Sequence, residues 1–553
     1  MNDTDLARAN LLLQQGRRHE AVGCFESYLK THPQSAEAWH NLGVTFSQMR
    51  RYNDAVPAFD RALAICPESA QTWSNRGNAL VEQRRFDEAV RDFDRALAID
   101  PQIPNVRGYR LLAKLWCCDW DGLEEEKRTI AQGLRAGERV IQPFGNLMIS
   151  GDPAEQLQCA RIWTQGRTPV ALWRGERYAH DKIRVAYLSG DFRTHPVAIL
   201  MAGVLEHHDA SLFETVAVSF GPGDRSDLRN RIASSVGRFI DVRGKTDFET
   251  AGLLRELEID IAVDLMGLTG ECRSGILAHR AAPVQVNYVG FPGTMAMPEM
   301  DYLLADETVI PKDEQRHYTE KIVYLPHSYL PADSKRRVGK SLKRAEAGLP
   351  EKGFVFAAFN NSYKIAPAVF GVWMRLLSAI DGSVIWLSQA NPAAERNLRQ
   401  EAAKYGVDPD RLVFAPFLNS IDDHLARVAL ADLFLDTLPC NAHTTASDAL
   451  WVGLPVLTAR GSTFAGRVAA SLLHAVGLDA LITPSLADYE ALALRLARNP
   501  HELASLRARL QDNRESFPLF DTARFARHLE AAYRGMWERC RKGSAPESFA
   551  VPA

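Results

Sequence analysis

The sequence predicts an all-α repeat superhelix followed by an α/β region made of two Rossmann-like lobes. Three observations carry this prediction. The first hundred residues repeat with a period of 34, the chain after Asp181 alternates short apolar runs with helical stretches, and both halves of that later region open with the same kind of turn. The chain has 553 residues, 46% of them hydrophobic and 24% charged, which is typical of globular proteins with several domains.

The composition argues against two classes of partner. A net charge of −3 lacks the basic excess of a general nucleic-acid binder. The longest apolar run near the middle of the chain, 196–205, is only ten residues long, whereas a membrane-spanning helix needs roughly 20. The polar N-terminus has no secretory-signal pattern, and the eight Cys form no CxxC pair. We therefore expect a cytoplasmic protein without nucleic-acid or membrane partners; the sequence does not predict its oligomeric state.

The repeats occupy 1–101. The positions that recur at intervals of 34 are Ala21, Ala55 and Ala89; Phe25, Phe59 and Phe93; Pro33, Pro67 and Pro101; Trp39 and Trp73; and Gly43 and Gly77. Small residues let two helices approach closely, aromatic residues fill the space between them, and Pro ends the second helix. This is the pattern of the tetratricopeptide (TPR) helical hairpin, and it predicts three repeats.

Residues 102–180 still have a helical pattern, and we expect them to continue the stack as a TPR-like extension. A TPR superhelix offers a concave groove that suits an extended polypeptide. The alternative is that the repeats serve only in dimerisation or in stabilising the fold.

The α/β region divides into a first lobe at 181–335 and a second lobe at 336–521. The apolar runs that predict strands are 183–192, 215–221, 259–267, 283–290 and 321–326, then 354–360, 383–389, 411–417, 433–437 and 455–459. Continuous apolar strands separated by helices indicate parallel sheets covered on both faces. The basic stretch 331–350 is the expected link between lobes, and the C-terminal helix and tail, 522–553, are expected to cross back to the first lobe.

Two turns of equal length open the lobes. Residues 186–196 (AYLSGDFRTHP) and 357–367 (AAFNNSYKIAP) each run from a strand through a turn to a Pro where a helix starts. Ligands of open α/β sheets bind beyond the carboxyl ends of the strands. We expect both turns to border the ligand site, at a cleft between the lobes.

The segment 433–459 carries the strongest binding signal. A strand ends at Asp436, a Pro-containing loop follows, and a helix is expected to start near Thr445 and end at Gly453. The free N–H groups of a helix start suit a diphosphate, and His443, Thr444 and Thr445 add side-chain donors. Asp448, one turn later, is placed to accept both hydroxyls of a ribose. The alternative is that Thr445 and Asp448 only form a capping box.

This segment resembles the donor site of GT-B glycosyltransferases, and more closely that of glycosyltransferase family 41, the O-linked N-acetylglucosamine (O-GlcNAc) transferases, in their bacterial form. The matching motifs are 438–458 (LPCNAHTTASDALWVGLPVLT), 190–196 (GDFRTHP), 282–294 (APVQVNYVGFPGT) and 359–367 (FNNSYKIAP). With the TPR start, the resemblance covers nearly the whole chain. It implies a GT-B fold behind the TPR superhelix.

The resemblance also implies roles for individual residues. It assigns Lys364 and Asn361 to the diphosphate of a uridine diphosphate (UDP) sugar, Lys364 neutralising the leaving group, whereas a solvated surface Lys is the alternative. The segment with Asn419, His424 and Arg427 corresponds to the uracil site, although Ile421 stands where animal members have Lys. The turn that carries Gly290, Pro292, Gly293 and Thr294 corresponds to a region near the sugar or acceptor.

His195 precedes Pro196 at a helix start, which disfavours imidazolium and keeps the ring neutral. By resemblance it belongs to the active site, with general base as one role and a structural helix cap as the alternative. No metal site is expected: the three Asp-x-Asp triplets, at 92–94, 119–121 and 408–410, lie away from the expected cleft. We therefore expect metal-independent chemistry, with the helix dipole and Lys364 in place of a cation, and the resemblance implies UDP-GlcNAc as donor and no cofactor.

The predicted reaction is inverting transfer of GlcNAc from UDP-GlcNAc to Ser or Thr hydroxyls of a polypeptide that contacts the TPR groove and the interlobe cleft. Two alternatives remain open. The first is transfer of glucose from UDP-glucose to Asn, as in some bacterial members of the family. The second is a non-catalytic TPR adaptor that binds a nucleotide sugar. Animal members have more repeats and a long domain between the lobes, so their substrate range does not carry over.

Overall fold

The computed structural model describes residues 3–166 and 169–553, so 167–168 of the expected helical extension lie outside the described residues. Contacts divide the chain into two compact units. One comprises 1–145 with 390–398, and the other comprises 146–389 with 399–553. No helix in the described ranges is both long and apolar enough to span a membrane.

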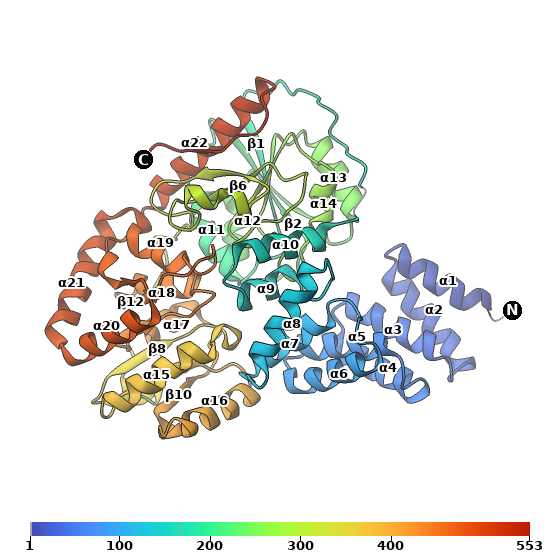
Figure 1. Ribbon diagram of the computed structural model, residues 1–553. Coiled ribbons are helices and arrows are strands. Elements are labelled where there is room, and N and C mark those ends of the chain that lie inside the picture. Colours follow the sequence, from blue (N-terminus) through green and yellow to red (C-terminus); the bar gives the residue numbers. More distant parts are fainter. Residues whose placement is uncertain (1–2, 167–168) are drawn as a thin grey trace. The chain divides into compact units, whose positions relative to one another are not determined.

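The first unit is a series of antiparallel helix pairs (Figure 1). Its helices are α1 (Asp3–Gln14), α2 (Arg18–Thr31), α3 (Ala36–Gln48), α4 (Tyr52–Ile65), α5 (Ala70–Glu82), α6 (Phe86–Ile99), α7 (Val106–Trp116) and α8 (Leu123–Arg135). Ser35 and Ser69, 34 residues apart, cap α3 and α5 by accepting a backbone N–H. The predicted three repeats are therefore confirmed as helical hairpins.

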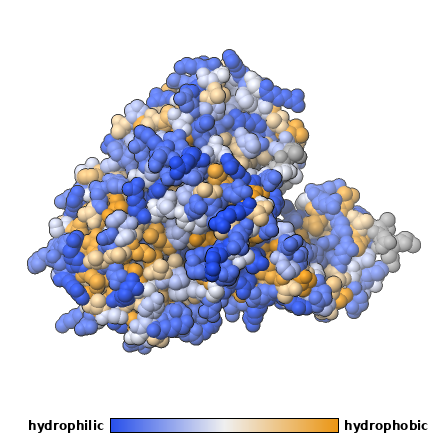
Figure 2. Space-filling view, viewed as in Figure 1, coloured by the Kyte–Doolittle hydropathy of each residue, from blue (hydrophilic) through white to orange (hydrophobic). Residues whose placement is uncertain are grey.

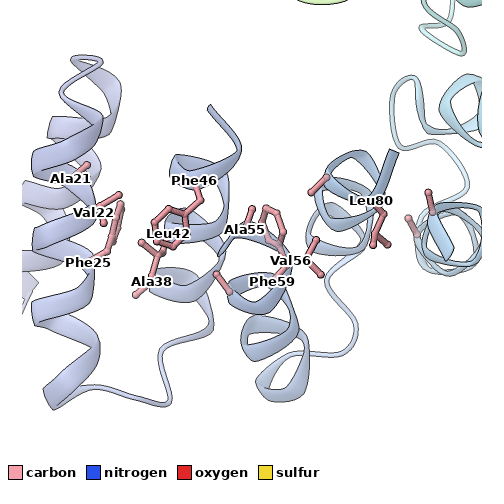
Figure 3. Packing of buried hydrophobic residues seen from close by; sticks show 14 of the residues in the cluster. Ala21, Val22, Phe25, Ala38, Leu42, Phe46, Ala55, Val56, Phe59 and Leu80 are labelled. Atoms are coloured by element: carbon pink, nitrogen blue, oxygen red, sulfur yellow. The ribbon is translucent and has the colours of Figure 1, made fainter. Parts of the chain in front are cut away.

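Close packing explains why the repeat uses Gly and Phe together. A Cβ on Gly43 would lie 2.6 Å from the Phe59 ring, and one on Gly77 would lie 2.7 Å from Phe93. Both Phe side chains are fully buried. Figure 3 shows Phe25, Phe46 and Phe59 directed between neighbouring helices, where they fill the space that small residues leave.

A fourth helix pair, α7 and α8, follows without the Gly, Phe and Pro of the repeat. A different feature recurs there at an interval of 34 residues: an Arg side chain that bonds two carboxylates. Arg76 donates to Asp60 (2.5 Å) and Asp92 (2.6 Å), and Arg110, 34 residues later, donates to Asp94 and Glu126. The ion-pair positions recur although the apolar consensus does not, so the hairpin geometry extends past Pro101.

The second unit contains two parallel sheets. The first has the order β14-β7-β6-β5-β4-β1-β2-β3 and the second β10-β9-β8-β11-β12-β13. The strands of the first are β1 (Ile183–Ser189), β2 (Phe213–Ser219), β3 (Arg238–Asp241), β4 (Ile261–Asp264), β5 (Val284–Asn287), β6 (Tyr302–Ala305), β7 (Lys321–Tyr324) and β14 (Phe549–Ala550). Those of the second are β8 (Val355–Ala358), β9 (Val384–Ser388), β10 (Leu412–Ala415), β11 (Leu433–Leu435), β12 (Val456–Ala459) and β13 (Ile482–Thr483).

Every predicted apolar run overlaps a strand, and each observed pairing is parallel. The predicted two Rossmann-like lobes are thus confirmed. In each sheet the first strand of the lobe, β1 or β8, lies between the second and fourth strands. The chain reverses its direction of winding beside that first strand, and ligands of such sheets bind at the carboxyl ends there.

Helices complete both lobes, although residues 143–145 of α9 and 392–398 of α16 belong to the first unit. They are α9 (Pro143–Ile149), α10 (Pro153–Thr164), α11 (Pro196–Glu206), α12 (Asp227–Ser235), α13 (Asp247–Glu256), α14 (Gly275–Ala278), α15 (Pro367–Ala379), α16 (Pro392–Lys404), α17 (Ile421–Val428), α18 (Thr444–Trp451), α19 (Val468–Ala475), α20 (Leu486–Arg498), α21 (Pro500–Ser516) and α22 (Thr522–Arg541). As expected from the sequence, α22 returns to the first lobe. It lies beside the first lobe (Figure 1) and packs on α11 and β5, and β14 then pairs with β7.

Four strands have no counterpart in the predicted set: β3, β6, β13 and β14. All are two to four residues long, and such short runs differ little from loop sequence. The expected link 331–350 contains no regular element except a 3₁₀ turn at Arg344–Ala347.

Candidate donor site in the second lobe

Lys364 lies in a 3₁₀ turn, Ser362–Lys364, directly after β8. Its Nζ donates a hydrogen bond to the carbonyl oxygen of Asn441 at 2.7 Å. Burial disfavours the ammonium, but the neighbouring Cys440, Tyr363 and Asp436 outweigh that effect and raise the pKa of Lys364. The side chain is therefore a protonated, partly enclosed cation at the carboxyl ends of β8 and β11.

The loop that presents Asn441 is organised by Asp436. Its Oδ1 accepts the backbone N–H of Thr437 (2.8 Å) and of Ala442 (2.6 Å), and its Oδ2 accepts the Thr458 hydroxyl at 2.6 Å. Burial raises the pKa of Asp436 to about 6, against the stabilising effect of these donors and of Lys364. One buried carboxylate thus closes the loop between β11 and α18.

Helix α18 begins without a side-chain cap. Its N-cap residue is His443, and the first intrahelical bond runs from the Ser447 N–H to the His443 carbonyl. The N–H groups of Thr444, Thr445 and Ala446 have no intrahelical acceptor, as in the first turn of any helix. They supply the positive end of the helix dipole on the side of the loop that carries Asn441.

Side chains around this helix start connect it to β8. Thr445 Oγ1 donates to Asn360 Oδ1 at 3.0 Å, and Asn360 Nδ2 donates to Thr437 Oγ1 at 2.8 Å. His443 Nε2 lies 3.4 Å from the Ala465 carbonyl. Burial, and then the positive charge of Lys364, lowers the pKa of His443 well below its usual value. His443 is therefore neutral and close to Lys364.

Asp448 does not form the capping box that was the alternative interpretation, because the helix starts one residue earlier and Asp448 has another partner. Its Oδ1 accepts from Arg336 Nη1 at 2.7 Å. Burial raises the pKa of Asp448 to about 6, and Arg336 opposes that rise. The sequence pointed to Asp448 but missed Arg336, which belongs to the basic stretch between the lobes.

The expected uracil segment forms the start of α17. His424 Nδ1 lies 3.1 Å from Arg427 Nη2, and its ring meets the edge of Phe359. Burial and the Arg427 charge lower the pKa of His424 to about 4. Arg427 is buried and also donates to the Pro416 carbonyl. Asn419 is exposed.

Asn361, also exposed, donates from Nδ2 to the Tyr363 hydroxyl at 3.1 Å. This contact directs the amide along the turn that carries Lys364.

His195 is the N-cap of α11. Its Nδ1 accepts the Val197 N–H at 3.3 Å and lies 3.3 Å from Asp191 Oδ2. Burial lowers the pKa of His195, Asp191 opposes this and Arg193 adds to it. The ring is thus neutral, with burial as the main cause rather than the helix start alone. The helix cap, which was the alternative interpretation of His195, is present, and about a third of the side chain remains exposed.

The turn that carries Gly290, Pro292, Gly293 and Thr294 follows β5. A Cβ on Gly290 would lie 2.0 Å from the Leu265 carbonyl oxygen, so only Gly fits there. Pro292, Gly293 and Thr294 are buried, and the Thr294 hydroxyl donates to Glu320 at 2.6 Å. Gly290 is the one of the four that is partly exposed.

The structure therefore brings together Lys364, His443 and Thr445 at one helix start, and it places Asp448 on the same helix. His424 and Arg427 form a second group in the same lobe. His195 and the Gly290 turn lie at strand ends of the first lobe, and no hydrogen bond among the described residues joins them to the second-lobe groups. Asn360, Asp436 and Asn441 support the site but were not predicted; the available signal was that polar residues follow β8 and β11 directly.

No group of three or more His, Cys, Asp or Glu side chains suited to a metal ion occurs in the described part of the chain.

Comparison with known proteins agrees with this architecture. Residues 154–346 and 341–529 match the family described as Glycosyl transferase family 41, and residues 6–70 and 70–103 match tetratricopeptide repeats. The chain is similar over 98% of both lengths to the solved structure of a mutant O-GlcNAc transferase of Thermobaculum terrenum, with a TM-score of 0.73 and 28% identity.

Two plant proteins give closer sequence matches. The probable UDP-N-acetylglucosamine–peptide N-acetylglucosaminyltransferase SEC of Arabidopsis thaliana is 35% identical over 74% of this chain and 44% of its own length. The corresponding SPINDLY protein of Oryza sativa subsp. japonica is 34% identical over 68% of this chain and 41% of its own length. The chain thus spans less than half the length of these relatives. On this evidence the chain belongs to glycosyl transferase family 41.

Proposed function

We propose that this protein transfers N-acetylglucosamine from UDP-GlcNAc to Ser or Thr hydroxyls of polypeptides in the cytoplasm, with inversion and without a metal ion. The observation that carries the proposal is the Lys364 ammonium, bonded to the Asn441 carbonyl beside the uncapped start of α18. The relatives support the donor and the acceptor, because their names specify UDP-N-acetylglucosamine and peptide.

The donor diphosphate would lie against the free N–H groups of Thr444, Thr445 and Ala446, with Lys364 as its counter-charge. Charge builds on the β-phosphate as the bond to the sugar breaks. A fixed cation and a fixed helix dipole lower the energy of that state without any reorganisation. They would take the role that a divalent cation has in metal-dependent transferases.

The ribose would follow the diphosphate, and uracil would lie beyond the ribose. The Asp448 carboxylate would accept the ribose hydroxyls, and the segment with Asn419, His424 and Arg427 would contact uracil. A neutral His424 suits an uncharged base, because it brings no net charge to the contact. Asn361 would add an amide contact to the diphosphate.

The acceptor hydroxyl would attack the anomeric carbon from the side opposite the leaving oxygen. One C–O bond forms, the bond to the β-phosphate oxygen breaks, the hydroxyl proton passes to a base, for which His195 and a phosphate oxygen of the donor are the candidates, and UDP departs, so the configuration inverts. His195 and the partly exposed Gly290 would border the sugar or the acceptor from the first lobe.

The polypeptide would also contact the repeats. A groove of about 440 Å³ between α2, α3 and α4 has Leu42, Phe46 and Trp39 in its wall and Lys30 and Arg61 among its charged residues. Figure 2 shows apolar side chains at the surface of the N-terminal helices, among polar ones. A mixed lining of this kind suits an extended peptide with both apolar and charged side chains.

The test is a transfer assay with UDP-GlcNAc and with UDP-glucose, using Ser/Thr and Asn peptides in the presence of a chelator. We expect GlcNAc on Ser or Thr, at a rate that the chelator does not change. Glucose on Asn would instead support the second chemistry of the family. UDP binding by calorimetry without transfer to any acceptor would support a non-catalytic adaptor, and no UDP binding at all would overturn the donor site.

A further inference from the structure

Arg336 is a buried cation in the segment that joins the two lobes. Its side chain is 4% exposed, and the guanidinium lies 5.1 Å from the centre of the Trp451 ring and 6.0 Å from that of Phe520. A charge so enclosed needs ionic and hydrogen-bonding partners. Its partners explain why this residue occurs in the stretch between the lobes.

The three nitrogens of Arg336 each have an acceptor. Nη1 donates to Asp448 Oδ1 at 2.7 Å, Nη2 to Ser447 Oγ at 3.3 Å, and Nε to the Asp333 carbonyl at 3.1 Å. Two of these acceptors are side chains of α18. The Asp448 carboxylate accepts from Arg336 through Oδ1, which leaves Oδ2 without a hydrogen bond from any residue that the structure describes.

The backbone just before Arg336 is held by residues that belong to, or pack on, the first lobe. The Asp333 carboxylate accepts from Arg231 Nη1 at 2.5 Å and Nη2 at 3.1 Å. Ser334 N–H donates to Thr522 Oγ1 at 3.0 Å. The backbone that carries Arg336 is thus anchored on α12 and α22, so the position of the guanidinium is set from outside helix α18.

We propose that Arg336 is a positioning residue for the donor ribose, holding the Asp448 carboxylate by Oδ1 so that Oδ2 faces the 2′- and 3′-hydroxyls of the nucleotide. The inference rests on the proposed donor site. Ionised carboxylates accept hydroxyl hydrogen bonds more strongly than neutral ones, and a planar guanidinium fixes both the charge and the orientation of its partner. Neither effect arises from a residue that only fills space.

The prediction is a loss of ribose discrimination. In the wild type we expect UDP to bind about 10-fold more tightly than 2′-deoxy-UDP, because a hydrogen bond to a charged acceptor is lost with the hydroxyl. In Arg336→Met the Asp448 carboxylate loses its orienting partner. We expect the ratio of the two dissociation constants to fall to about 2, mainly through weaker binding of UDP.

Arg514→Met is the matched control, since Arg514 lies over the same Trp451 ring at 5.3 Å and donates to the Trp451 carbonyl but does not contact Asp448 in the described structure. It should keep the wild-type ratio. Arg336→Lys is the second variant, for use if Arg336→Met does not fold. Lys keeps the positive charge but lacks the planar guanidinium with its several N–H donors. The ratio of the two dissociation constants should therefore fall at least about 3-fold below that of the wild type.

The measurement is titration calorimetry with UDP and with 2′-deoxy-UDP on the full chain. A folded Arg336→Met or Arg336→Lys variant with the wild-type ratio would overturn the inference and leave the donor site intact. An equal loss of ratio in Arg514→Met would also overturn it, because the effect would then be general to the Trp451 region. A wild type that binds neither nucleotide would instead refute the proposed function.

Discussion

Lys364 Nζ and the carbonyl oxygen of Asn441 lie 2.7 Å apart, although 77 residues separate them in the chain. Each follows a neighbouring parallel strand, Lys364 after β8 and Asn441 after β11. Neighbouring parallel strands end at the same edge of a sheet, so the two turns meet there. The contact fixes an ammonium beside the start of α18, where the proposed leaving group would develop its charge.

Replacement of Lys364 by Met should lower kcat by about 10²- to 10³-fold, because the group that neutralises the leaving diphosphate is removed while the side-chain volume is kept. UDP affinity should fall as well, since part of the interaction exists in the bound product. Steady-state kinetics with UDP-GlcNAc and calorimetry with UDP measure the two effects separately.

Lys352→Met is the control for Lys364, because Lys352 is an exposed lysine before the same strand. It should behave as the wild type. A Lys364→Met variant with kcat within about 3-fold of the wild type would show that Lys364 is a solvated or structural lysine, and the donor geometry proposed above would then be incorrect.

The sequence predicted most of the strands, and the start of α18 to within one residue, because both depend on local signals. The run 433–437 is apolar up to Leu435 and polar from Asp436, and the segment that follows it is rich in hydroxyl groups. The partner of Asp448 was not predictable in the same way. Arg336 is 112 positions away in a stretch with six Lys or Arg residues from 335 to 344, and composition does not indicate which of them is buried.

The repeats show the same distinction. The Gly, Phe and Pro period stops at Pro101, whereas the helical hairpins continue through α8. The signal that continues is the Arg76 and Arg110 ion-pair spacing, which requires the partners to be known before it can be recognised. Short strands such as β13 and β14 carry too few residues for a pattern, and only their parallel neighbours define them.

Replacement of His195 by Ala should lower kcat by about 10²-fold, the usual contribution of a positioned acid–base or hydrogen-bonding group. Asp191→Asn should also lower kcat, because the Asp191 carboxylate lies 3.3 Å from Nδ1 and stabilises the imidazolium that forms when the ring takes up a proton. The buried ring is neutral, so wild-type activity should decline only as the pH falls below the usual His value of about 6.5.

His207→Ala is the control for His195. His207 is the exposed residue at the opposite end of α11 and bonds the Gly203 carbonyl. It should leave kcat unchanged. An Asp191→Asn variant with wild-type kcat, beside an impaired His195→Ala variant, would contradict the general-base role and leave His195 as a hydrogen-bonding or capping residue.

Gly43→Ala should destabilise the first unit by about 1–3 kcal/mol, because the new methyl group overlaps the fully buried Phe59 ring. Gly23→Ala, in the interior of α2 with no atom within 4 Å of the added Cβ, should instead stabilise it by about 0.5–1 kcal/mol through helix propensity. Denaturant titration followed by circular dichroism measures the change in the free energy of unfolding, and hence its sign, for each variant. Equal shifts in the two variants would show that the Gly43–Phe59 packing is not what the repeat requires.

Asp436 closes the loop between β11 and α18, called the donor loop below, and it makes the free energy of unfolding depend on pH. Its pKa in the folded protein is about 6, above the 3.8 of a free Asp. Between these values the folded state therefore binds more protons than the unfolded state, and the stability due to this group falls as the pH rises from about 4 to about 6. Above that window the cost of keeping the buried carboxylate ionised is constant, on the order of 2–3 kcal/mol.

Asp436→Asn removes this titration while its amide oxygen still accepts the Thr437 and Ala442 N–H groups. The free energy of unfolding should therefore fall less between pH 4.5 and pH 7 in the variant than in the wild type, as urea titrations at the two pH values measure. Asp264 and Asp448 have raised pKa values as well, so the comparison must be of the variant with the wild type. Asp512→Asn, at an exposed position, should reproduce the wild-type difference. If Asp436→Asn does so too, Asp436 is not the buried acid that closes the donor loop.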